Sequence, residues 1–472
     1  MKTRPPTKPA YRHFHIVYSL KLMQKMLVLC IVPLIEPLAA LDLAGLLNAL
    51  RQELLLLAVL AAAAGVFWAG AGWRLGKGEL ELRTGVLARR FRRLNLRQVA
   101  VVELARPPLL RLAGCTRMTI YLSKSGSMPK VCLYLPRQAA AGLAEILLPT
   151  RTGQSFYKPT GAERLGFVML SANLVTTAAL LWLSARQTVE LLGENLAGSL
   201  NSLTRENLAR LEQLAELFLP AGVAWLFTLA FVLSGISLLV SLLKTARFHV
   251  SRSGGVIFYR GGLFSHTERR VRAAAVTVCD VRTTPAARLL RRYPVYLAAG
   301  SFDGGDIPVL VYKKGQEALL EALMPEFSLP GPARRGLYAN GRSLPAFLGL
   351  PGTLLGACLV LVAVSAWQLP AFTPLLGLLL LPALALALVA LEAFFTEDAT
   401  QSAGRVLLVQ YSRGFTRHRL CVFTPDLALS IQQTPFSELQ GRCNLRLLLP
   451  FYKKIRVRSL EFYRAASLRL DV

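Results

Sequence analysis

The chain alternates three times between a pair of long apolar stretches and a basic block with the pattern of β-strands. The apolar pairs lie at residues 22–47 with 54–73, 165–183 with 217–243, and 347–367 with 372–395. The blocks that follow them cover residues 75–160, 244–330 and 396–472. Repetition of this kind indicates one structural unit used several times, so the three parts are predicted to fold alike.

The apolar stretches have the length and composition of membrane-spanning helices. The chain is 53% hydrophobic and 17% charged, whereas about a quarter of the residues in a soluble domain are charged. About 20 apolar residues suffice to cross a bilayer as a helix, and residues 375–391 contain no charge. The sequence therefore predicts an α+β membrane protein with six transmembrane helices arranged as three hairpins.

The distribution of charge predicts the orientation of these helices. The formal net charge is +28, and the basic residues gather in the three blocks and in the lead at residues 1–21. The predicted hairpin tips at residues 40–53 and 185–216 are poor in Lys and Arg and contain several acidic residues. Because loops rich in Lys and Arg stay in the cytoplasm, we expect a multi-pass protein with both termini and all three blocks cytoplasmic.

Each block is predicted to form a β-sandwich or barrel that a helix closes. Short alternating runs are separated by turns at Gly85, Gly262 and Gly414, as expected for β-hairpins. Helical patterns follow at residues 136–148, 315–324 and 459–468. Several strands and one helix at the end form a compact unit with a single core.

In the first block, the periodicities predict which residues form the core. Strand alternation places Val99 and Val101 on one face. Helical spacing places Leu143 and Ile146 on one face of the closing helix. All four side chains are therefore predicted to lie in the first core.

The first two blocks align without a gap over their middle. Gly85 corresponds to Gly262, and Arg93 to Arg270; the other matched pairs include Val99 with Val276, Pro108 with Pro285 and Arg111 with Arg288. The third block is looser and lacks the arginine after its corner at Thr434, Pro435 and Phe436. With this order of hairpin and block, the chain resembles the bacterial pleckstrin-homology (PH)-like domains of the second type, in the multi-pass inner-membrane form with three copies (YdbT-like). The resemblance implies a PH-like fold for each block and supplies no activity.

No motif for catalysis or for a cofactor stands out. The chain has no HExxH, GxGxxG, Walker or GxSxG pattern. Its seven cysteines occur singly, which does not indicate a metal site. His266 and His418 follow glycine turns and are predicted to be exposed. We therefore expect neither an enzyme nor a bound cofactor or metal, and the position of the arginines beside membrane spans argues against nucleic acid as a partner.

The best candidate for a binding site is the run formed by Arg89, Arg90, Phe91, Arg92 and Arg93. On a strand, Arg90 and Arg92 share one face, while the other members share the opposite face. Guanidinium groups suit phosphates and carboxylates, so the run fits an anionic lipid or an acidic partner.

These patterns predict a non-enzymatic scaffold or regulator that binds protein partners at the membrane. Two alternatives remain open at this stage. One is a protein that binds anionic lipid headgroups, and the other is a transporter or a component of a membrane enzyme.

Overall fold

The computed structural model describes the greater part of the chain. The described residues are 11–22, 43–76, 78–86, 88–123, 130–150, 155–159, 163, 213, 221–313, 315–316, 318–325, 343–368, 370, 373–402, 406–423, 428–449 and 454–468. The predicted span at 165–183 and almost all of the tip at 185–216 lie outside them, as does most of the predicted span at 22–47.

One order of elements recurs three times: three strands, a fourth strand, a short corner helix, two strands and a closing helix. Unit one contains β2 (Gly72–Leu75), β3 (Glu79–Thr84), β4 (Arg90–Asn95), β5 (Val99–Arg106), α4 (Pro108–Leu112), β6 (Cys115–Leu122), β7 (Lys130–Pro136) and α5 (Arg137–Leu147). Unit two contains β9 (His249–Ser253), β10 (Val256–Gly261), β11 (His266–Arg272), β12 (Val276–Thr283), α9 (Pro285–Leu290), β13 (Arg292–Ala299), β14 (Leu310–Lys313) and α10 (Ala318–Leu323). Unit three contains β15 (Asp398–Ser402), β16 (Val406–Arg413), β17 (Thr416–Phe423), β18 (Ala428–Gln432), α13 (Pro435–Leu439), β19 (Arg442–Leu448), β20 (Lys454–Glu461) and α14 (Phe462–Ser467).

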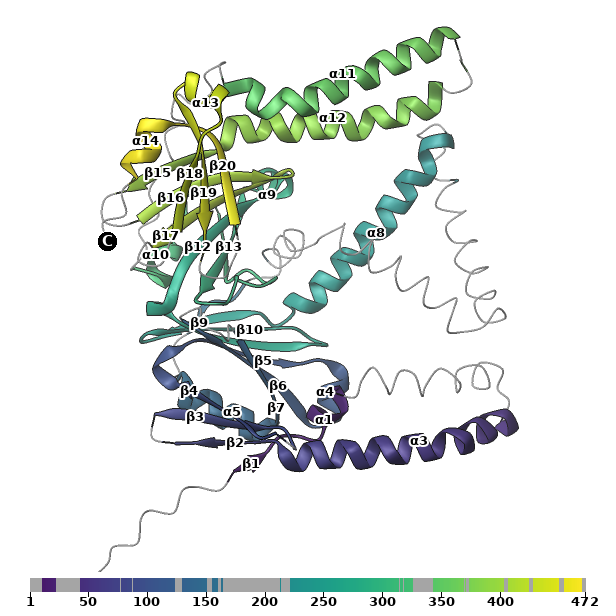
Figure 1. Ribbon diagram of the computed structural model, residues 1–472, viewed down its shortest axis with the longest axis vertical. Coiled ribbons are helices and arrows are strands. Elements are labelled where there is room, and N and C mark those ends of the chain that lie inside the picture. The colour runs from purple at the N-terminus through teal and green to yellow at the C-terminus, as the bar shows by residue number, and fades with distance from the viewer. Residues whose placement is uncertain are drawn as a thin grey trace, which may run out of the picture.

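The sheets do not follow the boundaries of the units. Two further short strands, β1 (Arg12–His13) and β8 (Ser155–Tyr157), lie outside this repeated order. The described strands form sheets with the orders β1-β2-β3-β4, β7-β6-β5-β11-β10-β9-β8, β14-β13-β12-β17-β16-β15 and β18-β19-β20. In the second sheet, β5 of unit one pairs antiparallel with β11 of unit two. In the third sheet, β12 of unit two pairs antiparallel with β17 of unit three. The three units are therefore joined edge to edge by backbone hydrogen bonds (Figure 1).

Each unit encloses a core between its first three strands and its last three. The first core lies between β2–β4 and β5–β7, and α5 covers it with Ala140, Leu143, Ala144 and Leu147. The second core is built in the same way with α10, and the third with α14. The predicted α+β architecture, with several sheets and closing helices, is present.

Strand β5 is buried on both faces, and this corrects one prediction. Val99 contributes to the first core, but Val101 contributes to the second. The register of β5 against β6 shifts between these two valines, and a bulge of this kind turns following side chains to the other face. Val101 is therefore buried as predicted, but in the core of the next unit.

The prediction for Ile146 was wrong. The buried stripe of α5 runs through Ala140, Leu143 and Leu147, with the spacing of one helix face. Ile146 lies beside this stripe and is 54% exposed.

The end of the basic lead also belongs to unit one. At the end of this lead, β1 (Arg12–His13) pairs with β2, and Phe14 is buried in the first core. The short helix α1 (Val17–Leu22) follows, and the backbone N–H of His15 donates to the carbonyl oxygen of Tyr134 on β7. The predicted lead is thus partly an element of the fold.

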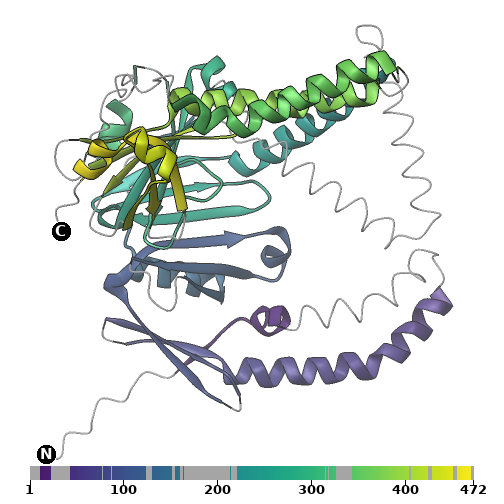
Figure 2. The same cartoon turned by 45° about the horizontal axis from the view of Figure 1, so that its top comes forward.

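Long apolar helices extend from one side of the stacked sheets: α3 (Leu43–Gly70), α8 (Ala221–Thr245), α11 (Leu344–Gln368) and α12 (Thr373–Thr396) (Figures 1 and 2). Within the described residues, two helical segments are long and apolar enough to cross a membrane, Leu344–Gln368 and Leu379–Thr396. Shorter apolar helical segments are Ala58–Gly70 and Phe231–Thr245.

The predicted limits of the first hairpin need correction. Helix α3 begins at Leu43 and so includes most of residues 40–53, which were expected to form a tip. The helix ends at Gly70, and Trp73, expected at the end of the span, belongs to β2.

The burial of α5 generates a direct test of the first core. Leu143→Ala should lower the free energy of unfolding by about 2–5 kcal/mol, because it leaves a cavity. Ile146→Ala should change it by less than about 1 kcal/mol, because that side chain is mostly exposed. Denaturant unfolding of the full chain in detergent measures both values. Equal losses for the two variants would contradict the orientation of α5.

Candidate functional site

The arginine run lies on an exposed strand of unit one. Arg90, Phe91, Arg92 and Arg93 belong to β4, and Arg89 precedes it; all five side chains are exposed. Leu94 of the same strand is buried in the first core. By strand alternation, Arg90 and Arg92 share the face of Leu94, and Phe91 and Arg93 share the opposite face. The structure brings the predicted residues together on a single strand.

The four arginines differ in their partners. The Nε atom of Arg93 lies 3.2 Å from Oε1 of Glu81 on β3. Glu81 also accepts a hydrogen bond of 2.6 Å from Nε of Arg74, and this bond is the main reason why its pKa falls below the ordinary value. No ion pair to Arg89, Arg90 or Arg92 occurs within the part of the chain that the structure describes. Glu81 therefore partly neutralises the charge of Arg93, whereas Arg92 has no carboxylate partner within the described residues.

Strand β4 is an edge strand, unlike its counterparts. In units two and three, the counterparts β11 and β17 pair on both sides. In the described residues, β4 pairs only with β3. Unpaired edges expose backbone N–H and C=O groups that can bind another strand. The arginine run therefore coincides with an open position in a repeated pattern of pairing.

A buried ion pair joins units one and two. Glu103 of β5 faces Arg269 of β11 in the strand register, and Oε1 of Glu103 lies 3.0 Å from Nη2 of Arg269. The hydroxyl of Tyr121 donates to the other carboxylate oxygen at 3.2 Å. Although burial opposes its charge, Tyr259 and Glu103 favour it and raise the pKa of Arg269. A buried charge requires a partner, so the pair favours this register of the junction.

A second buried pair occupies the matching place between units two and three. Nδ1 of His418 on β17 lies 3.1 Å from Oδ2 of Asp280 on β12, and Nε of Arg282 lies 2.9 Å from the same oxygen. The ring of His418 stacks on Tyr411, with centroids 4.7 Å apart. The prediction that His418 is exposed was wrong, because the paired strand of the preceding unit covers this turn-proximal position.

The environment of Asp280 shifts its titration. Burial alone would raise the pKa of this carboxyl, but the hydrogen bond and charge of His418, with Arg282, outweigh burial and hold the pKa below its ordinary value of 3.8. The folded state therefore favours the ionised form of Asp280.

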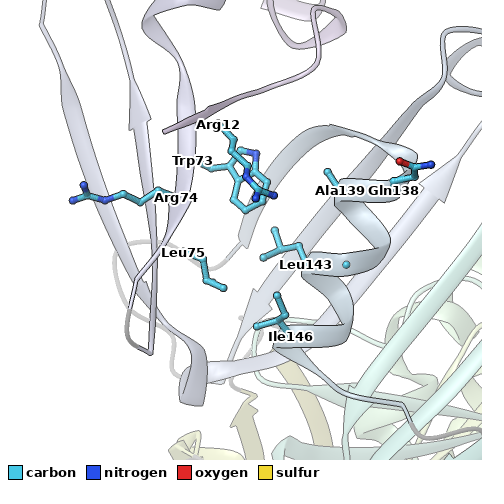
Figure 3. A pocket seen from close by; sticks show the side chains of 9 residues that line it. Arg12, Trp73, Arg74, Leu75, Gln138, Ala139, Leu143 and Ile146 are labelled. Carbon is cyan, nitrogen blue, oxygen red and sulfur yellow. The ribbon is translucent and has the colours of Figure 1, made fainter. Parts of the chain in front are cut away.

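A groove of about 510 Å³ lies between β2 and α5 (Figure 3). Leu143 and Ile146 extend from the helix toward Trp73 and Leu75, so the walls are mainly apolar. The guanidinium of Arg12 lies 5.6 Å from the ring centroid of Trp73. This groove contains none of the four predicted arginines.

The corner helices carry exposed apolar side chains. The side chains that are at least 80% exposed are Leu109 and Leu112 on α4, Leu289 on α9, and Phe436 and Leu439 on α13. The strand register places the start of α4 beside the turn before β11, because Arg106 pairs with His266. That turn is bonded to the end of α8, since the N–H of Leu263 donates to the carbonyl of Leu243 at 2.8 Å. The corner of unit one therefore lies at the same end of the sheets as an apolar helix.

Ion pairs attach the third helical hairpin to the sheets. Near the end of α12, Oε1 of Glu392 lies 2.8 Å from Nε of Arg417 on β17 and also pairs with Arg288 on α9. Glu397, just after α12, lies 2.7 Å from Nη2 of Arg458 on β20. Burial raises the pKa of Glu397 above its ordinary value, although Arg458 acts in the opposite direction. The hairpin is thus held by both sheets that flank the third core.

Within the described ranges, no group of three or more His, Cys, Asp or Glu side chains lies close enough together to hold a metal ion.

Comparison with known proteins addresses the first unit. The family model of the bacterial PH domain matches residues 27–152. Residues 27–152 are therefore similar to a bacterial PH domain. The match includes the PH-like domain's arginine strand, its corner helix α4 and its closing helix α5. No curated protein and no solved structure matched the chain.

The buried acids at the junctions were not predicted as functional or structural residues. Glu103 and Asp280 each stand five residues before a corner proline, Pro108 or Pro285. An acid at the same position in two aligned strands that are rich in apolar residues was the signal that could have identified them, since buried acids require partners.

Removing one partner of the Glu103–Arg269 pair should lower the free energy of unfolding more than removing both partners. Glu103→Leu leaves Arg269 buried without its carboxylate and should lower the free energy of unfolding by about 3–5 kcal/mol. The double variant with Arg269→Met should recover most of this loss. Denaturant unfolding of the full chain in detergent measures both. A single variant that loses less than about 1 kcal/mol would contradict the proposed arrangement.

The second junction predicts a pH dependence. Because the pKa of Asp280 is lower in the folded state, ionisation of this group stabilises the fold above its unfolded pKa, and this stabilisation is lost as the pH falls through the folded pKa. The stability difference between the wild type and Asp280→Asn should therefore be largest above about pH 5 and shrink below about pH 4. Thermal unfolding between pH 3 and pH 7 tests this, and a difference that grows on acidification would refute it.

Proposed function

We propose that the chain is a multi-pass protein of the bacterial inner membrane that displays three PH-like sandwiches in the cytoplasm. In this proposal, it acts as a non-enzymatic scaffold or regulator that binds protein partners. The observation that carries the proposal is the direct connection of apolar helices to sheets. Helices α3, α8 and α12 end at Gly70, Thr245 and Thr396, and the first strand of a unit begins within four residues of each. Such short connections leave the units little freedom to move away from the membrane.

The corner helices support this orientation. Leu109, Leu112, Leu289, Phe436 and Leu439 would be costly to expose to water as a group, and apolar side chains flanked by arginines suit the interface of a bilayer. Arg111 and Arg288 lie on two of these helices. The proposal therefore includes contact of the three corners with the lipid interface, next to the ends of the helices.

A protein partner is favoured by the open edge of β4. The two counterparts of this strand each bind another strand, and β4 has the same position in its unit. Backbone groups along an open edge suit another polypeptide, and they offer nothing comparable to a lipid headgroup.

Anionic lipid is a second candidate ligand, and a specific observation favours it for the start of the strand. A Cβ atom added to Gly70, at the end of α3, would lie 2.8 Å from the carbonyl oxygen of Gly85. The turn that leads to Arg89 and Arg90 therefore lies beside the end of the helix. Each Lys or Arg close to an anionic membrane surface contributes about 1 kcal/mol to the free energy of membrane binding.

The orientation can be tested by fluorescence quenching. Leu112→Trp in lipid nanodiscs should be quenched by brominated lipids, because the corner is proposed to touch the bilayer. Gln98→Trp is the matched control, since residue 98 is exposed at the other end of β5, about 25 Å away. The comparison subtracts the signal of the five native tryptophans. Equal added quenching at both positions would refute the orientation.

Cysteine labelling tests the proposed sidedness. Reagents that do not cross the membrane should label a cysteine introduced at residue 201 from outside intact cells, and should label residues 313 and 454 only after the membrane is opened. Labelling of residue 313 from outside would overturn the cytoplasmic placement of the units.

A further inference from the structure

We propose that β4 is a docking edge for an extended strand of a partner protein, and that this strand places an acidic side chain opposite Arg92. The inference rests on the proposed function and deepens it by defining the chemistry of the partner. It follows from the two junctions within the chain, which show how a strand of this type binds a neighbour.

Position by position, Arg92 is the counterpart of Arg269. Arg92 pairs with Leu82 across β3 and β4, and Arg269 pairs with Tyr259 across β10 and β11. Leu82 and Tyr259 both lie in the core of their unit. Arg269 reaches Glu103 of the preceding unit across the junction. Arg92 has the same place on the core side of its strand, and within the described residues no strand on that side supplies it with an acid.

The surroundings of Arg92 fit a strand more closely than a phosphate. On the other face of β4, Phe91 is 59% exposed, which gives the edge an apolar contact next to the free cation. Arg93 is already bound to Glu81. A strand with an acid and a neighbouring apolar residue would satisfy Arg92 and cover Phe91 together.

The register of the first junction defines the partner's sequence pattern. Arg269 faces Glu103, Glu268 faces Leu104, and Val271 faces Val101. Transferred to β4, these pairs place an acid opposite Arg92, an apolar residue opposite Phe91, and another apolar residue opposite Leu94. The expected pattern along the partner strand is therefore apolar, any residue, acid, apolar.

A second copy of this chain fits less well. The strand that a second copy could offer is β18, whose counterparts β5 and β12 take part in the junctions. Five residues before its corner proline, Pro435, this strand has Ser430 where the others have an acid. Arg446 and Lys454 on the neighbouring strands would bring further positive charge to the arginine edge. Strand β18 of a second copy thus lacks the acid that the docking edge calls for, and the proposal assigns this acid to a different protein.

A peptide that copies residues 98–107 provides a defined probe, because it contains β5 and its glutamate. It is added to the full chain in nanodiscs of phosphatidylcholine, and binding is followed by fluorescence anisotropy. Arg92→Glu should weaken binding of this peptide at least about tenfold, since a close charge pair at an interface becomes repulsive. Changing the glutamate of the peptide to lysine should restore binding to the Arg92→Glu chain to within about threefold of the original pair.

Arg413→Glu is the matched control, because Arg413 is an exposed arginine at the end of β16 and the substitution makes the same charge change. It should alter binding less than about threefold. In hydrogen exchange, the peptide should protect amides of β4 and leave those of β18 unchanged. Failure of the peptide to bind, equal losses from both variants, or failure of the swapped pair would each overturn the docking edge.

Crosslinking in native membranes separates this inference from the proposed function. A partner captured by the wild type and lost in Arg92→Glu, but retained in Arg413→Glu, supports both. A partner captured equally by all three chains leaves the scaffold function standing and overturns the docking edge. If the peptide binds in the predicted register but no protein is captured from the membranes, the edge is supported and the scaffold function fails. Loss of binding only to vesicles of phosphatidylserine in Arg92→Glu, with peptide binding unchanged, would assign the edge to lipid and overturn the inference.

Discussion

The pairing of strands across unit boundaries is the interaction on which the rest of the structure depends. Strand β5 completes the sheet of unit two, and β12 completes the sheet of unit three. Because each of these strands has one face in its own core and one in the next, neither unit can separate without exposing apolar surface and breaking a row of backbone hydrogen bonds. A chain of three domains on flexible linkers would have neither property.

Buried charges give this pairing its register. An unpaired acid in an apolar interface is unfavourable, so Glu103 and Asp280 favour the alignment in which Arg269 and His418 can reach them. The loop that follows β13 lies against the ion pair of Glu103 and Arg269. Gly305 in this loop has a φ of +63°, and a Cβ atom added there would lie 2.8 Å from the guanidinium of Arg269. A larger residue at that position would be strained by the backbone conformation and would displace the guanidinium of Arg269.

The sequence predicted the elements of each unit well, because strand alternation and glycine turns are local signals. It predicted the sheets less well, because the partner of an edge strand is not a local property. Val101 illustrates the difference: alternation identified it as buried, and only the bulge and the neighbouring unit determine in which core it lies. His418 was assigned to the surface for the same reason. The residues of the arginine run lie on one strand, and their role stays a prediction. That β4 pairs on one side only in the described residues is seen by comparing the three sheets.

The continuity of the sheets is tested most directly by hydrogen exchange of the full chain in lipid nanodiscs. Strand β4 is the internal reference, because it has the same place in its unit as β11 and pairs with only one strand in the part of the chain that the structure describes. The account predicts that amides of β5 and β11 exchange slowly and with a common protection, while the outer amides of β4 exchange much faster. Exchange of β11 as fast as that of β4 would contradict the account, because it would mean that the units are not joined through their sheets.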